Sequence, residues 1–194
     1  MKITTLKIQQ AIEFATEKHK DNKRKGTDTE YINHPLEAME IAATLTDDED
    51  TICAAVLHDT VEDAGVSVKE LATLFGGRVA SLVADESENK RPNLPPEETW
   101  KIRKTEALEH LRHASRDAKI VALSDKLSNM RSIHRDYEKI GDKFLERFNC
   151  KIKTEQGWYY GSFVKIFEEF ADTDAWQEYK AHVDAVFGAD VNSK

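Results

Sequence analysis

The chain has 194 residues and a formal net charge of −8, with 40% hydrophobic and 33% charged residues. This mix predicts a soluble, helix-rich domain with its own core and excludes a disordered chain. The acidic balance argues against a general binder of long DNA or RNA, because such proteins carry an excess of basic residues.

Helical spacing of apolar residues runs through most of the sequence. The first predicted helix spans residues 6–20, and the second spans 35–46, beginning at Pro35. Proline is favoured at the first position of a helix, where its missing N–H has no helical partner. The third predicted helix covers 48–64 and follows an acidic pair, whose charge suits a helix N-terminus.

The next predicted helix begins with a capping box formed by Ser67 and Glu70 and ends at Gly76–Gly77. Residues 86–96 are a polar loop that contains prolines, and residues 26–33 could be a loop or a short hairpin. Further helical segments are predicted at 78–84, 97–113, 117–136, 142–149, 158–171 and 174–187. Because no strand pattern appears, we predict an all-α fold in one domain of residues 1–194.

The sequence also indicates where in the cell the protein is expected. Residues 1–20 lack the apolar stretch of a signal peptide, and no apolar run approaches the ~20 residues that span a bilayer. Cys53 and Cys150 are too far apart for a CxxC motif, so neither a zinc knuckle nor a redox pair is indicated. We therefore expect a cytoplasmic protein without a membrane partner.

Several ionisable residues interrupt apolar surroundings. They are His34 before Pro35, His58–Asp59 after the run ICAAVL, Glu62–Asp63 one turn later, and Asp125 within VALSDKLSN. The apolar run would draw His58 and Asp59 into the interior, where an ionised carboxylate is unfavourable unless it is paired or bound to a metal. Within a helix, positions 58, 59 and 62 would share one face.

Imidazole and carboxylate groups together suit divalent metals such as Mn²⁺, Fe²⁺ or Zn²⁺. Two histidines and two aspartates would supply up to four ligands and leave room for water and substrate. A metal there would polarise a phosphoryl oxygen and lower the pKa of a water molecule. Glu62 and Asp63 are then placed to orient that water or to move its proton.

Each of these residues also has a structural interpretation. His58–Asp59 could be a hydrogen-bonded pair, and His34 could fix a turn before Pro35. Asp125 could pair with Lys126 or with a neighbouring helix. Glu62–Asp63 could be the solvated end of a helix.

Basic residues suggest an anion pocket in an otherwise acidic protein. Residues 18–25 hold five lysines and arginines, of which Arg24 is the strongest candidate for a ligand contact, and further cations lie in the helices around Asp125. These further cations are Arg103, Lys104, Lys126 and Arg131. Such side chains could neutralise a polyphosphate, although a charge run is also typical of a solvated face. Lys153 and the aromatic residues 158–160 could contact a base or simply pack.

The order His34, His58–Asp59, Asp125 resembles the H…HD…D signature of the HD superfamily. Longer strings narrow the resemblance to the hydrolase domain of the RelA/SpoT family, and most closely to its small stand-alone hydrolases. The strings are KRKG…YINHPLEA, AAVLHDTVEDAGVS, LFGGRVASLV and VALSDKLSNMRSIHRD. The resemblance covers roughly residues 5–170 and none of it falls on the synthetase domain of the long family members, so we expect hydrolysis without synthesis.

This resemblance implies a bundle of about eight to ten helices and one Mn²⁺, or another divalent metal, as cofactor. The implied metal ligands are His34, His58, Asp59 and Asp125, and the implied water-handling pair is Glu62 and Asp63. Arg24 and Lys25 would lie near the guanine or its phosphates, Asn129 beside the ribose or a phosphate, and Arg103 and Lys126 among the substrate contacts. The reaction would be hydrolysis of the 3′-pyrophosphate of (p)ppGpp to GDP or GTP and pyrophosphate.

The sequence departs from this family at two places. Glu30 stands where relatives tend to have proline, and residues 86–90 replace an apolar–threonine step before an acidic–lysine segment. Because that loop flanks the site in relatives, two alternatives stay open. One is an HD phosphohydrolase that acts on another nucleotide, such as the 2′-phosphate of NADPH. The other is a non-catalytic sensor of the alarmone.

Overall fold

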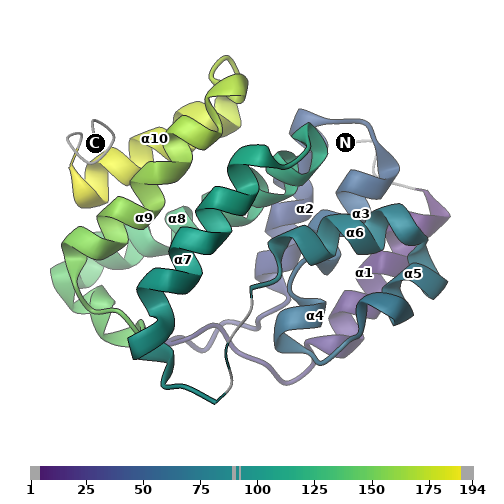
Figure 1. Ribbon diagram of the computed structural model, residues 1–194, viewed down its shortest axis with the longest axis horizontal. Helices are drawn as coiled ribbons and strands as arrows, with labels where there is room; N and C mark the ends of the chain where they lie inside the picture. The colour runs from purple at the N-terminus through teal and green to yellow at the C-terminus, as the bar shows by residue number, and fades with distance from the viewer. Residues whose placement is uncertain (1–4, 89–90, 92, 189–194) are drawn as a thin grey trace. The chain divides into compact units, whose positions relative to one another are not determined.

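The computed structural model describes residues 5–88, 91 and 93–188, and its regular structure is helical (Figure 1). Within these residues there is no strand, only one isolated antiparallel bridge between Lys23 and Glu30. The prediction of an all-α fold is therefore confirmed. The chain forms two compact units: unit 1 holds residues 1–87 and 114–125, and unit 2 holds 88–113 and 126–194. The single domain of the sequence analysis stays a prediction.

Unit 1 is built around α3, whose residues 51–57 are all buried. Its elements are α1 (Leu6–Lys18), α2 (Asn33–Leu45), α3 (Glu49–Leu57), α4 (Thr60–Asp63), α5 (Val68–Phe75), α6 (Gly77–Glu86) and the first part of α8 (Arg116–Ile140). Helices α1, α2 and α6 all pack on α3. A helix that is buried all round is a core helix, so α3 sits at the centre of the unit.

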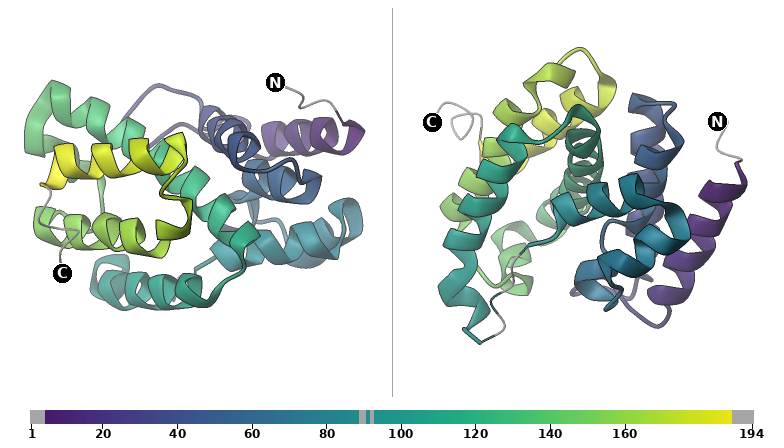
Figure 2. Two further views of the ribbon diagram at one scale, coloured as in Figure 1. Left: turned by 90° about the horizontal axis from the view of Figure 1, so that it is seen from above. Right: turned by 45° about the vertical axis from the view of Figure 1, so that its right-hand side comes forward.

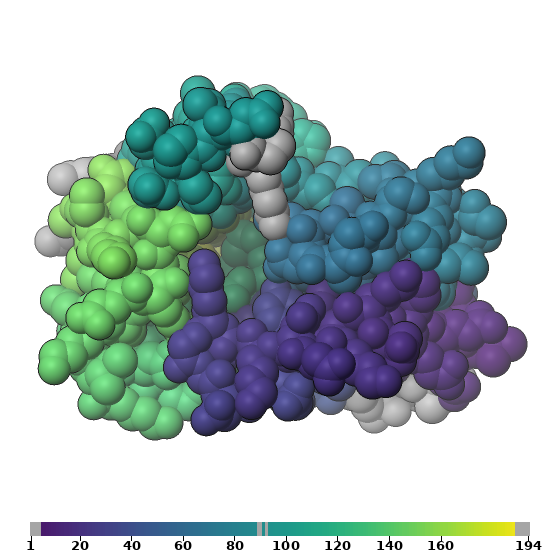
Figure 3. Space-filling view, turned by 90° about the horizontal axis from the view of Figure 1, so that it is seen from below, coloured from purple at the N-terminus to yellow at the C-terminus, as the bar shows by residue number. Residues whose placement is uncertain are grey.

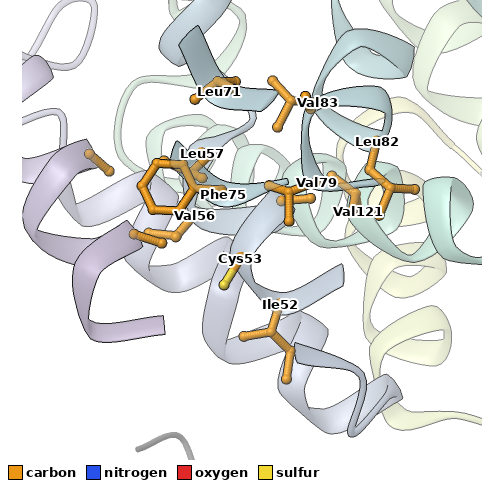
Figure 4. Packing of buried hydrophobic residues seen from close by; sticks show 14 of the residues in the cluster. Ile52, Cys53, Val56, Leu57, Leu71, Phe75, Val79, Leu82, Val83 and Val121 are labelled. Atoms are coloured by element: carbon orange, nitrogen blue, oxygen red, sulfur yellow. The ribbon is translucent and has the colours of Figure 1, made fainter. Parts of the chain in front are cut away.

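The core of unit 1 joins α3 to α5, α6 and α8 (Figure 4). Leu57, Leu71 and Val121 are fully buried and Phe75 is 5% exposed. Burying a side chain of this size contributes about 1.5–3 kcal/mol, so this cluster holds the unit together. Cys53 is buried and unpaired in the same cluster, as a small core residue.

Side-chain caps fix where the helices of unit 1 begin. Asp48 accepts a hydrogen bond from the backbone N–H of Thr51, and Ser67 accepts one from that of Glu70. The Glu70 carboxylate lies 3.4 Å from the ammonium group of Lys18 on α1. The purple surface of the N-terminal helix borders a blue surface in Figure 3. Phe14 of α1 and Phe75 of α5 make an edge-to-face contact. The predicted N-cap at Ser67 is therefore confirmed.

The predicted helix over 48–64 is wrong in its middle, because α3 ends at Leu57 and α4 begins at Thr60. Two side chains take carbonyl groups that the helix would otherwise use. The ring Nδ1 of His58 bonds to the carbonyl of Ala55 at 2.8 Å, and the Thr60 hydroxyl donates to the carbonyl of Leu57 at 2.7 Å. Such local bonds compete with the helical ladder, so His58 and Asp59 occupy a turn.

Residues 19–32 link α1 to α2 through a hairpin-like turn. The backbone N–H of Tyr31 donates to the carbonyl of Asn22, and that of Arg24 donates to the carbonyl of Thr29. Gly26 adopts a φ of 77° within this turn, a conformation that glycine takes without strain. Of the two options that the sequence left open here, the short hairpin is thus nearer to the structure.

Unit 2 is helical as well. Its elements are α7 (Pro96–His113), the remainder of α8, η1 (Gly141–Arg147), α9 (Lys153–Ile166), η2 (Glu168–Phe170) and α10 (Asp174–Phe187). Helices α9 and α10 lie side by side (Figure 2), where the Tyr179 hydroxyl donates to the carbonyl of Tyr160 at 2.7 Å. The segment predicted at 142–149 is 3-10 helix, and the one at 158–171 begins earlier, at Lys153, and is split at Phe167.

No helix in the described part of the chain is both long and apolar enough to cross a membrane.

Candidate functional site

Two imidazoles and two carboxylates meet inside unit 1. The Nε2 atoms of His34 and His58 are 3.3 Å apart. Asp59 Oδ2 lies 2.9 Å from His58 Nε2, and Asp125 Oδ1 lies 3.0 Å from His34 Nε2. The four side chains are between 2% and 17% exposed. Four donor atoms at these separations form a nearly closed cluster, and His34, His58 and Asp59 alone already have the spacing of a metal site.

Three separate segments bring these residues together. His34 lies in the first turn of α2, His58 and Asp59 occupy the turn between α3 and α4, and Asp125 lies in α8. All four residues belong to unit 1, of which Asp125 is the last on α8. The turn after α3 is anchored by the buried apolar run that precedes it, so the core of unit 1 positions the cluster.

The backbone fixes the tautomer of His58. Only an N–H can bond to a carbonyl, so the contact between Nδ1 and the carbonyl of Ala55 places a proton on Nδ1. In the neutral ring, Nε2 then carries the lone pair, and it faces Asp59 and Asp125. An imidazole whose other nitrogen donates to a backbone carbonyl is the usual form of a metal ligand.

Within the cluster, the imidazole rings and carboxylates pair with one another. Burial disfavours a charged ring, but the Asp59 carboxylate and the hydrogen bonds with Asp125 and Asp59 hold the pKa of His58 well above its ordinary value. Burial would likewise raise the pKa of Asp59, yet His58 and the hydrogen bonds from His34 and His58 hold it well below the ordinary value. Two imidazole nitrogens and two carboxylates at this spacing are a ligand set that fits a divalent cation.

Glu62 and Asp63 lie in α4, directly after this turn, where Glu62 is half-buried and Asp63 is exposed. The backbone N–H of Asp63 donates to the carbonyl of Asp59 at 2.8 Å. The short helix thus ties the acidic pair to the cluster by one turn of backbone. The water-handling roles of Glu62 and Asp63 stay predictions.

Two residues that the sequence analysis did not single out lie beside the cluster. The Tyr31 hydroxyl donates to Asp59 Oδ2 at 2.7 Å and lies 3.2 Å from Asp63 Oδ2. The ring of His19 packs on that of Tyr31, with 4.9 Å between the centroids. The signal for Tyr31 was its place three residues before His34. His19 gave no signal, because nothing in the pattern tells a buried histidine from an exposed one at a helix end.

The candidate substrate contacts divide between the units. In unit 1, Arg24 is half-buried and Lys25 is exposed in the turn after α1. In unit 2, Lys126 and Asn129 are half-buried on α8, and the ammonium group of Lys126 lies 5.5 Å from the centre of the Phe163 ring. Their roles toward a substrate stay predictions.

Arg103, the remaining candidate contact, is buried in unit 2. Its guanidinium group lies 2.7 Å from the Glu88 carboxylate and also donates to the carbonyl of Pro96 at 3.3 Å. Lys104 pairs with the other oxygen of Glu88. Glu88 belongs to the segment 86–90 in which the sequence departs from its relatives, and residues 89–90 lie outside the described residues. Arg103 therefore has a structural partner, and its substrate role stays a prediction.

Replacing Glu88 with glutamine is expected to lower the free energy of unfolding at pH 7 by about 3 kcal/mol, because two largely buried cations lose their counter-charge. Burial raises the pKa of Glu88, but Lys104, Lys126 and Arg103 together hold it below the ordinary value. A carboxylate whose pKa is lower in the folded than in the unfolded state stabilises the fold at pH values above its unfolded-state pKa. This stabilisation is lost as the pH falls through the folded-state pKa.

The difference between wild type and Glu88→Gln should therefore shrink as the pH falls below about 4.5, the ordinary glutamate value. Denaturant titrations at several pH values measure it. Glu109→Gln is the matched control. Glu109 pairs with Arg112 on the exposed face of α7, the helix that also carries Arg103 and Lys104, so this change should alter stability little. A Glu88→Gln protein as stable as wild type at pH 7 would contradict the assignment.

The aromatic residues 158–160 pack within unit 2. Tyr159 and Tyr160 are buried, and Trp100 makes edge-to-face contacts with Trp158 and Tyr159. The ammonium group of Lys101 lies 3.2 Å from the centre of the Trp158 ring. Lys153 pairs with Asp142. Of the two interpretations of this segment, packing is the one that these contacts support.

Comparison with known proteins places the chain in a family. The family model described as HD domain matches residues 11–146, which is more than half of the chain. The guanosine-3′,5′-bis(diphosphate) 3′-pyrophosphohydrolase MESH1 of Danio rerio is 39% identical over 136 residues, which cover 68% of this chain and 72% of the relative. The protein of the same name from Drosophila melanogaster is 34% identical over 192 residues, 93% of each chain.

Solved structures agree on the fold. The crystal structure of lmo0812 from Listeria monocytogenes EGD-e has a TM-score of 0.70 and 27% identity, and covers 83% of this chain and 99% of that one. A metazoan ortholog of SpoT has a TM-score of 0.62 and 23% identity, covering 100% and 93%. These findings confirm the resemblance to the RelA/SpoT hydrolase domain. The chain belongs to the HD domain family, within which it is similar to the MESH1 proteins.

Proposed function

We propose that this chain is a divalent-metal-dependent hydrolase that removes the 3′-pyrophosphate of guanosine-3′,5′-bis(diphosphate). The observation that carries the proposal is the convergence of His34, His58, Asp59 and Asp125 in a chain similar to enzymes named for this reaction. Fold alone does not define a substrate, so the named relatives supply the substrate and the cluster supplies the chemistry.

The proposed metal ligands are the four residues of the cluster, and Mn²⁺ is the proposed ion because mixed imidazole and carboxylate ligands suit it. When bound, the ion supplies a Lewis acid that polarises a phosphoryl oxygen and makes a water molecule more acidic. In the neutral ring of His58, the lone pair on Nε2 faces Asp59 and Asp125, the orientation that a metal ligand needs.

Glu62 and Asp63 are the proposed acid–base pair. A carboxylate there accepts a proton from the attacking water as its oxygen bonds to the phosphorus of the 3′-pyrophosphate. The bond between that phosphorus and the ribose 3′ oxygen breaks, and the 3′ oxygen takes up a proton. One water is consumed, and the products are pyrophosphate and GDP, or GTP when the substrate carries a 5′-triphosphate.

Cationic and polar side chains are the proposed contacts of the nucleotide. In unit 1 these are Arg24 and Lys25, and in unit 2 they are Arg103, Lys126 and Asn129. Guanidinium groups bind phosphate oxygens in pairs, and ammonium groups bind them as point charges. These residues would give affinity for a highly charged small nucleotide in a protein whose net charge is −8.

A hydrolysis assay with separated products tests the proposal. Purified protein is incubated with ppGpp, with pppGpp and with NADPH, each with Mn²⁺ and with a chelator. We expect manganese-dependent release of pyrophosphate and GDP from ppGpp. Faster release of phosphate from NADPH would instead favour the other nucleotide considered above, and binding of ppGpp without turnover in metal-loaded protein would favour a sensor.

A further inference from the structure

We propose that Tyr31 is a positioning residue, whose hydroxyl fixes the carboxylate of Asp59 toward the cluster and holds Asp63 beside it. The inference rests on the proposed function, because it assigns Asp59 as a metal ligand and Asp63 to the acid–base pair. It adds to that function a residue from the turn before α2, outside both sets.

The Tyr31 hydroxyl bonds to the oxygen of Asp59 that faces the two histidines. Asp59 Oδ2 accepts from the Tyr31 hydroxyl at 2.7 Å, and the same atom lies 2.9 Å from His58 Nε2 and 3.4 Å from His34 Nε2. A carboxylate can rotate about its bond to the β-carbon and exchange its two oxygens. A donor fixed on Oδ2 restricts that rotation and keeps this oxygen facing the two imidazoles.

The same hydroxyl reaches the acid–base pair. Tyr31 Oη lies 3.2 Å from Asp63 Oδ2, so its single hydrogen is shared between two carboxylates, with the shorter contact to Asp59. Burial and the negative charges of Asp59, Asp63 and Asp125 raise the pKa of Tyr31 above its ordinary value.

Two histidine rings and a backbone hydrogen bond hold Tyr31 in place. His19 packs on it at 4.9 Å, and the ring of His34 meets it edge to face at 5.9 Å between centroids. The backbone N–H of Tyr31 donates to the carbonyl of Asn22 at 2.8 Å, within the hairpin-like turn. The hydroxyl is thus placed by a rigid support rather than by its own contacts alone.

His19 has the properties of a packing surface. It is 2% exposed, and neither ring nitrogen has a hydrogen-bond partner among the described residues. Burial lowers the pKa of His19, which keeps the ring uncharged. An uncharged flat ring supports Tyr31 without adding a second cation beside the proposed metal ligands.

Residues that orient a metal ligand typically change metal affinity or activity by about 10–100-fold when they are removed. Tyr31→Phe removes only the hydroxyl oxygen and leaves the ring packing intact. We therefore expect the dissociation constant for Mn²⁺, measured by competition with a chelator, to rise about 10–100-fold in this variant. At saturating Mn²⁺ we expect kcat for ppGpp to fall while KM stays near the wild-type value, because Asp63 loses its support.

Three further variants separate positioning from packing. Tyr137→Phe is the matched control, since its ring packs on Phe144 in unit 2, and it should keep the wild-type Mn²⁺ affinity. His19→Phe keeps a flat ring behind Tyr31 and should also keep that affinity. His19→Ala removes the support but not the hydroxyl, and should weaken Mn²⁺ binding in the same direction as Tyr31→Phe.

Wild-type Mn²⁺ affinity and kcat in Tyr31→Phe would overturn the positioning role while leaving the proposed function intact. A wild-type protein that binds Mn²⁺ but does not hydrolyse ppGpp would overturn the proposed substrate, and a weakened affinity in Tyr31→Phe would still support the positioning role. A wild-type protein that binds no Mn²⁺ would overturn both. If the melting temperature of metal-free Tyr31→Phe falls, the two His19 variants decide between positioning and packing. Weaker Mn²⁺ binding in His19→Ala than in His19→Phe supports the positioning role, and equal binding in the two overturns it.

Discussion

Replacing Asp59 with alanine is expected to abolish metal binding and hydrolysis together. Asp59 carries the carboxylate that lies nearest to His58 Nε2, and its removal leaves two imidazoles without this negative partner. A Lewis acid contributes several kcal/mol to phosphoryl transfer, so the rate should fall by at least about 10³-fold. Metal content by elemental analysis and ppGpp turnover, measured on the same preparation, check the expectation.

The matched control for this variant is Asp117→Ala. Asp117 is also a carboxylate of unit 1, but it pairs with Arg78 at the start of α8, outside the cluster. This control should retain metal and turnover. Asp125→Ala should behave as Asp59→Ala does. Hydrolysis that persists in a metal-free Asp59→Ala protein would show that the cluster is not the reaction centre.

The second large effect is expected for Glu62→Gln. Glutamine keeps the size of the side chain but cannot accept a proton, and Glu62 is not one of the four proposed ligands. The variant should therefore keep its metal while turnover slows by about 10²–10⁴-fold, the usual range for general acid–base groups. Metal content and single-turnover rates with ppGpp measure the two effects separately.

Glu70→Gln is the control for Glu62→Gln, because its carboxylate pairs with Lys18 on the surface of unit 1. It should turn over at the wild-type rate. Near-normal turnover in Glu62→Gln would move the proton transfer to Asp63. Asp63→Asn would then carry the large rate effect.

Much of the fold follows from periodicity, because apolar spacing decides which face of a helix is buried. The predicted helices over 97–113 and 174–187 match α7 and α10 to within a residue. The ligand candidates could be selected for the same reason, since ionisable residues next to an apolar run must find partners. His34, His58 and Asp59 do converge, and Asp125 lies with them.

The rest of the fold and of the site depends on side-chain contacts that the apolar spacing does not encode. The break after Leu57 arises because His58 and Thr60 bond to carbonyl groups three residues back, and helical periodicity continues across such a break without a change. Tyr31 reaches Asp59 across 28 positions of sequence. Glu88 pairs with Arg103 across 15 positions, so a loop that the sequence showed only as polar forms a buried ion pair.

The bond between His58 and the carbonyl of Ala55 also determines when conformational entropy is lost. An imidazole that rotates freely must be immobilised as its metal binds, and this ordering reduces the affinity. Here the ring is immobilised when unit 1 folds, together with the backbone of the turn after α3. The entropy lost in ordering this ring is therefore part of the free energy of folding. Metal binding does not have to supply it again, so the affinity of the ring for the ion is not reduced by this ordering.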